Sequence, residues 1–115
     1  MSPMAMDLSA LIAWLRDAVD KHGEGTRWVG LAEPHSYRGY YEDLSFEIEE
    51  TTLGASLRAA EDCVGTTFTG WSGGDYVMDN DTRVWCSPHG TSGGSQISAL
   101  MLDGLLLRAL AGGAQ

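Results

Sequence analysis

The chain has 115 residues, a formal net charge of −9 and a hydrophobic fraction of 43%. This length fits one domain with its own core, and the hydrophobic fraction argues against a disordered chain. The negative charge argues against broad contact with duplex nucleic acid or an anionic membrane, because both need a basic face. A small anionic ligand stays compatible with it, because salt screens charges beyond about 10 Å.

The first half of the chain predicts one helix followed by two strands. Apolar residues recur at helical spacing over residues 8–22, and Gly23 ends the pattern. The stretch "TRWVGL", residues 26–31, predicts a short strand that Pro34 terminates, because proline lacks a backbone N–H donor. The stretch "YEDLSFEIEE" alternates apolar and polar residues, which predicts a half-buried strand over about residues 41–49.

The second half predicts one more helix and then strands. Apolar spacing, with Thr51 or Thr52 as the cap and Gly65 as the stop, predicts a helix over about residues 53–64. The stretches "TTFTG", "DYVM" and "RVWCS" predict short strands joined by the turns "WSGG" and "DNDT". The order of elements predicts a single α+β domain over residues 1–115, with a small antiparallel sheet, an N-terminal helix and one further helix.

The last apolar segment, "QISALMLDGLLLRAL", fits two structures. Its leucine content is compatible with a helix. Asp103-Gly104 between two apolar runs is, however, a strong hairpin signal, and it favours strands over residues 96–102 and 105–110. We therefore expect antiparallel strands to fill the chain over about residues 66–110.

Residues suited to catalysis or metal binding are sparse. The three histidines lie far apart and the two cysteines form no CxxC pair, so the sequence predicts no metal site. Cys86 with His89 is the candidate nucleophile pair, but strand alternation places Cys86 in the core and Trp85 outside, which favours a structural thiol. The acids of the 41–49 strand indicate a solvated face. We expect no catalytic residue and no cofactor, with free thiols in a reducing cytoplasm.

Aromatic rings and arginine form the remaining candidate site. The stretch "HSYRGYYEDL" places Arg38 among three tyrosines, and further rings follow in the second half of the chain. Rings stack on nucleobases at about 1–3 kcal/mol per base, and arginine binds phosphate through paired hydrogen bonds. Each ring is also a good β-former that can simply pack the sheet.

Two stretches together resemble a known group of proteins: "HSYRGYYEDLSFE" and "GTTFTGWSGGDYVMDNDTRVWCSPHG". The pairing resembles small phage-encoded proteins, and among them the Thoeris anti-defence sponge proteins. The resemblance covers residues 34–90. It implies a non-catalytic protein that sequesters a host immune signal, a cyclic ADP-ribose isomer, and in some members a cyclic oligonucleotide. It also implies a homo-oligomer with pockets where subunits meet.

A cyclic ADP-ribose isomer needs a ring to stack on its purine, an amide or carboxylate for its hydroxyls and arginine for its phosphates. Phe68, Asn80 and Arg38 supply these three types, and Arg108 offers a second guanidinium. Where the relatives carry a basic residue after the third strand, this chain has "TSGGSQ". The expected ligand-binding residues are Tyr37, Arg38, Tyr40, Phe68, Trp71, Asn80, Trp85 and Arg108.

The expected protein is therefore a cytoplasmic anti-defence protein of an infected bacterial cell, with a small cyclic nucleotide and further copies of itself as partners. The apolar stripe of the 8–22 helix is a candidate contact with a second subunit. Two alternatives stay open: an accessory protein that binds a host protein, and a nucleotide-degrading enzyme.

Overall fold

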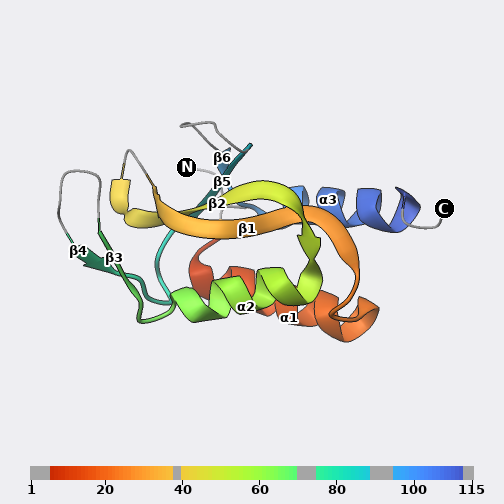
Figure 1. Cartoon of the computed structure of the whole chain (residues 1–115), viewed down its shortest axis with the longest axis horizontal. Helices are drawn as coiled ribbons and strands as arrows, with labels where there is room; N and C mark the ends of the chain where they lie inside the picture. The colour runs from red at the N-terminus through yellow and green to blue at the C-terminus, as the bar shows by residue number, and fades with distance from the viewer. Residues whose placement is uncertain (1–5, 38–39, 70–74, 89–94, 113–115) are drawn as a thin grey trace.

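The computed structural model describes residues 6–37, 40–69, 75–88 and 95–112, and side chains over residues 6–34, 44–67, 77–86 and 96–111. The described residues form three helices and six strands, in an α+β arrangement (Figure 1). In chain order these are α1 (Leu8–His22), β1 (Arg27–Tyr37), β2 (Tyr40–Thr52), α2 (Leu53–Cys63), β3 (Thr67–Thr69), β4 (Asp75–Val77), β5 (Val84–Pro88), β6 (Ser95–Gln96) and α3 (Ala99–Gly112).

The main sheet has the strand order β1-β2-β5-β6. β1 pairs antiparallel with β2, β5 runs parallel to β2, and β6 pairs antiparallel with β5. The sheet is thus mixed, and the prediction of a purely antiparallel sheet is wrong at β5. The chain leaves β2 through α2 and the separate β3–β4 ribbon before it returns as β5, and a crossover of this length permits a parallel neighbour.

The helices α1 and α2 contact each other and lie together below β1 and β2 in Figure 1, whereas α3 lies at the right-hand end. The prediction of a helix over residues 8–22 is confirmed by the bounds of α1. Asp7 caps this helix through a 2.9 Å hydrogen bond that its Oδ1 accepts from the Ala10 N–H. Leu8, Leu11 and Leu15 of the apolar stripe of α1 are fully buried in the core of its own domain, and Trp14 and Val19 pack against that core. The stripe is therefore not free to contact a second subunit.

The strand β1 continues beyond the point where Pro34 was expected to end it. The register against β2 shifts between Ala32 and His35, and Glu33 adopts a positive φ of 44°. A bulge of this kind leaves residues out of the ladder, so a proline there costs no inter-strand hydrogen bond. The expectation failed because proline stops regular pairing and not the strand as a whole.

The C-terminal segment is the helix α3, so the predicted hairpin over residues 96–102 and 105–110 is wrong. The Ser98 hydroxyl accepts a 3.2 Å hydrogen bond from the Met101 N–H and thereby caps the helix. Asp103 and Gly104 lie within the helix and not in a turn. Leu102 is fully buried, so tertiary packing decides the conformation against the local turn signal.

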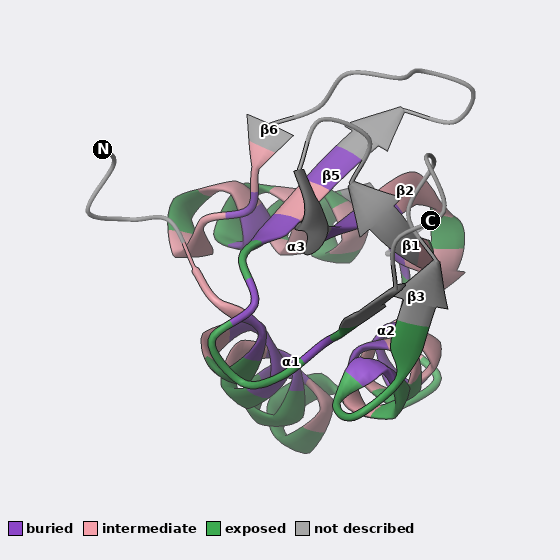
Figure 2. Cartoon of the chain, turned by 90° about the vertical axis from the view of Figure 1, so that its left-hand side faces the viewer, coloured by how far each residue is buried: buried purple, intermediate pink, exposed green. Residues whose placement is uncertain are grey.

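One hydrophobic cluster joins all three helices to the main sheet, and Figure 2 shows its buried residues on the inward sides of the elements. Trp28 of β1 stacks on Trp14 of α1 with ring centroids 5.8 Å apart. The Trp28 Nε1–H donates to the Ser56 hydroxyl of α2 at 3.1 Å, and the Trp14 Nε1–H donates to Asp103 of α3 at 3.0 Å. Within the described residues, no helix is long and apolar enough to cross a membrane.

Candidate functional site

Five of the residues predicted for ligand binding lie wholly or partly outside what the structure describes. Arg38 and Trp71 are outside the described residues, and for Tyr37, Tyr40 and Phe68 the structure describes the backbone alone. Tyr37 pairs with Tyr40 where β1 and β2 meet, and Phe68 pairs with a residue of β4 in the ribbon. The backbone therefore fixes the strand positions of these three residues.

The two segments that carry the resemblance come together in space. β1 contacts β3, and β2 contacts β4, so the ribbon lies beside the end of the β1–β2 pair. Figure 1 shows this grouping at the left-hand end of the molecule, away from α3. The strand positions of Tyr37, Tyr40 and Phe68 thus belong to one end of the fold, as a shared binding region requires.

The other three predicted residues are described in full, and they do not form one site. Asn80 is exposed between β4 and β5, where its backbone carbonyl accepts a hydrogen bond from the Ser9 N–H at 3.1 Å. The prediction that Cys86 of β5 lies in the core is confirmed, whereas its neighbour Trp85, which was expected to face outward, is half-buried. Arg108 is exposed on α3 and therefore belongs to a different part of the fold from Asn80.

Asn80 lines a pocket of about 330 Å³ at the junction of α1 and α2. This volume is at the lower end of the range for small-molecule sites. The pocket combines a guanidinium, a carboxylate, a hydroxyl and an amide with apolar surface. Its lining residues are Ser9, Ile12, Ala13, Arg16, Glu61, Val64 and Asn80.

Arg16 is the cation of this pocket, and it is not among the residues predicted for ligand binding. Its Nε–H and Nη2–H donate to Glu61 Oε2 at 3.1 and 2.8 Å. A guanidinium has five N–H donors in a fixed fork, so donors remain for an anionic ligand while the ion pair holds the side chain. The sequence carried no signal for this role, because a charged residue on the polar face of a helix is ordinary.

The two cysteine thiols are poor nucleophiles at neutral pH. Burial raises the pKa of Cys86 from 9.0 to about 11, and burial together with the nearby Asp62 carboxylate raises the pKa of Cys63 from 9.0 to about 12. A nucleophilic cysteine needs a lowered pKa, because the thiolate is the reactive form. Both thiols are protonated at neutral pH, which argues against Cys86 as a nucleophile; its candidate partner His89 lies outside the described residues.

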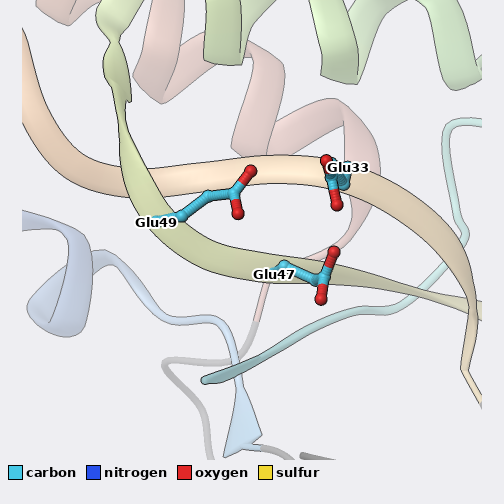
Figure 3. Close-up of side chains that lie close together, drawn as sticks. All are labelled: Glu33, Glu47 and Glu49. Carbon is cyan, nitrogen blue, oxygen red and sulfur yellow. The ribbon is translucent and has the colours of Figure 1, made fainter. Parts of the chain in front are cut away.

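Three glutamates of β1 and β2 gather at the sheet (Figure 3). The pairing sets Glu47 opposite Ala32, and the bulge brings Glu33 near, so that carboxylate oxygens of Glu33, Glu47 and Glu49 lie within 4.8 Å of one another. Carboxylate oxygens suit hard cations such as Ca²⁺, but each of the three residues also takes part in another interaction within the chain. The three carboxylates repel phosphate, so this part of the sheet does not suit a phosphate-containing ligand.

Comparison with known proteins finds no matching family model, no matching curated protein and no matching solved structure.

Proposed function

We propose that this protein binds and sequesters a small anionic nucleotide without transforming it. The observation that carries the proposal is the pocket at the junction of α1 and α2, where Asn80 and Arg16 come together. An amide can hydrogen-bond ribose hydroxyls, and a guanidinium can hydrogen-bond phosphate. The ligand class follows from the resemblance: a cyclic ADP-ribose isomer or another cyclic nucleotide.

Two further features support a binding role. The described cysteines are protonated at neutral pH, so neither supplies a thiolate for nucleotide hydrolysis. The strand positions of Tyr37, Tyr40 and Phe68 belong to one end of the fold, where β1 contacts β3 and β2 contacts β4. The proposal includes a cytoplasmic, self-associating protein that withdraws an immune signal in an infected bacterial cell.

The test is a calorimetric titration of the full chain. The ligand set contains cyclic ADP-ribose isomers, cyclic di- and trinucleotides, NAD and ADP-ribose. We expect nanomolar binding of one cyclic species and recovery of that species unchanged after the protein is heated. Recovery of a product would identify an enzyme instead, and absence of binding by the whole set would overturn the proposal.

Variants locate the binding residues. Arg16→Gln and Asn80→Ala test the pocket, and Arg38→Ala tests the segment of the resemblance. The matched control is Arg58→Gln, because Arg58 is an exposed arginine of α2 that is paired with Glu24 at 3.4 Å and does not line the pocket. If Arg38→Ala abolishes binding while both pocket variants behave like the control, the ligand lies at the β1–β2 end and the pocket has no part in it.

A further inference from the structure

The helix α3 exposes a leucine-rich face. Leu100 is 67% exposed and Leu107 is 68% exposed. Its opposite face packs on the domain through the fully buried Leu102 and the half-buried Met101, Leu105, Leu106 and Ala109. An amphipathic surface helix carries polar residues outward, so α3 departs from the usual pattern.

Four of the exposed residues of α3 have the spacing of a heptad pattern. Leu100, Gly104, Leu107 and Ala111 are exposed and recur at intervals of four, three and four residues. This is the a/d spacing of a two-stranded coiled coil, with leucine at the d positions and a small residue at the a positions. A Cβ added at Gly104 would have no other atom within 4 Å, so the backbone is open there to close approach.

Charge on this helix fits a second copy of the same chain. The protein carries a net charge of −9, which opposes self-association over most surfaces. The sequence of α3 contains one acid and one base, Asp103 and Arg108, and both side chains are exposed. In the heptad register Asp103 is at g and Arg108 is at the following e, the two positions that pair between parallel helices.

Orientation follows from the same two charges. In a parallel pair, Asp103 of each copy faces Arg108 of the other. In an antiparallel pair, g faces g and e faces e. Asp103 of one copy would then face Asp103 of the other, and Arg108 would face Arg108. Among the described residues no ion pair uses Arg108, and Asp103 Oδ1 accepts from Trp14, which leaves its second oxygen for a partner.

We propose that the exposed face of α3 is the contact surface of a two-fold dimer, in which two α3 helices pack in parallel along Leu100, Gly104, Leu107 and Ala111. The contact is isologous, as is usual for dimers of identical chains. It replaces α1 as the self-association surface, because the α1 stripe is buried. It rests on the self-association included in the proposed function, for which it names the surface, and it does not depend on which ligand is bound.

Disulfide trapping tests the register directly. Residues at a d position face each other across a parallel two-fold pair, so Leu107→Cys should crosslink under mild oxidation. The native thiols do not interfere, because Cys63 and Cys86 are both buried. The control is Asp20→Cys, an exposed position on α1. Crosslinking of Leu107→Cys that is no faster than that of the control would overturn the proposal.

Assembly measurements test the surface itself. Analytical ultracentrifugation at micromolar concentration should show that the Leu107→Asp assembly contains half as many subunits as the wild-type assembly. Val77→Asp is the matched control, because Val77 is 63% exposed but lies on the β3–β4 ribbon. A wild-type monomer, or an unchanged assembly order in Leu107→Asp, would contradict the helix pair.

Charge reversal tests the orientation. Arg108→Glu alone should weaken dimerisation by about tenfold, because each g–e contact of the pair then sets two carboxylates against each other. Mixing this variant with Asp103→Lys should restore dimers, since the mixed pair gains an attractive contact between the introduced lysine and the introduced glutamate. If neither single reversal changed the dimerisation affinity, the parallel pair would be excluded. In an antiparallel pair each of these charges already faces a like charge, so reversing one of them leaves the repulsion unchanged.

Discussion

At the scale of the residue, Trp28 holds β1 against α1 and α2. Its ring is 2% exposed and lies across Gly30, and its Nε1–H is bonded to Ser56, which in turn donates to the Leu31 carbonyl at 2.7 Å. A Cβ added at Gly30 would approach the Trp28 ring to 2.0 Å. Glycine is needed here for space and not for an unusual backbone angle.

The first prediction concerns this contact. Gly30→Ala should lower the free energy of unfolding by about 1–3 kcal/mol, because a buried and hydrogen-bonded indole has little room to move. Urea denaturation measures the effect. Gly25→Ala is the control, since a Cβ there meets no atom within 4 Å, and it should change stability by less than about 0.5 kcal/mol. Equal effects at both positions would show that the Trp28 ring is not fixed.

The second prediction concerns the buried thiols at high pH. Above pH 9.0 the unfolded chain releases its thiol protons, whereas the folded chain keeps them until about pH 11 at Cys86 and about pH 12 at Cys63. Ionisation therefore favours the unfolded state, and the stability that the thiols contribute is complete below pH 9.0 and falls above it. We expect the decline in the free energy of unfolding from pH 9.0 to about pH 11 to be smaller in Cys63→Ala/Cys86→Ala than in the wild-type chain.

Chemical modification provides an independent check. At about pH 8 neither native thiol should react with a thiol reagent until the protein unfolds in urea. Rapid labelling of Cys86 in the folded protein would mean that the thiol is accessible and would reopen its role as a nucleophile.

At the scale of the element, caps decide where helices begin. The Thr52 hydroxyl accepts the Ala55 N–H at 3.2 Å and opens α2 directly after β2. Thr52→Ala should therefore cost about 1 kcal/mol of unfolding free energy, measured by urea denaturation. Thr52→Ser keeps the acceptor oxygen and should lose much less. A serine variant as unstable as the alanine variant would assign the effect to the lost methyl group instead.

Elements with a strong hydrophobic period were predictable from sequence. The helix predicted over residues 8–22 has those bounds in α1, and the strand predicted over about 41–49 lies within β2. In these segments the buried face decides the conformation, and the sequence displays that face directly. The segment around Asp103 failed because its turn signal is local, whereas Leu102 is held by a core built from distant parts of the chain.

The candidate site was less predictable than the fold. Asn80 was named from its residue type, and the structure places it in the same pocket as Arg16, which is far away in the chain. No local pattern marks two residues that only a tertiary contact between α1 and the β4–β5 connection brings together. The parallel pairing of β2 with β5 was missed for the same reason, because strand order is a property of the whole chain.

At the scale of the whole molecule, one core connects both ends of the chain. Leu8 near the start and Leu102 near the end are both fully buried and belong to the same cluster. The Trp14–Asp103 hydrogen bond joins α1 to α3 at the surface. A domain with a single core of this size should unfold in one cooperative step.

The last prediction tests that cooperativity. Leu102→Ala should lower the free energy of unfolding by about 2–5 kcal/mol, because it opens a cavity in the shared core. Urea transitions followed by tryptophan fluorescence and by far-ultraviolet circular dichroism should shift together, since two of the four tryptophans, Trp14 and Trp28, pack in or against the core and ellipticity reports all helices. Leu107→Ala in dilute protein is the control and should change stability by less than about 0.5 kcal/mol, because Leu107 lies outward. If ellipticity were lost before fluorescence changed in Leu102→Ala, α3 would be a separately melting element and the single core would be wrong.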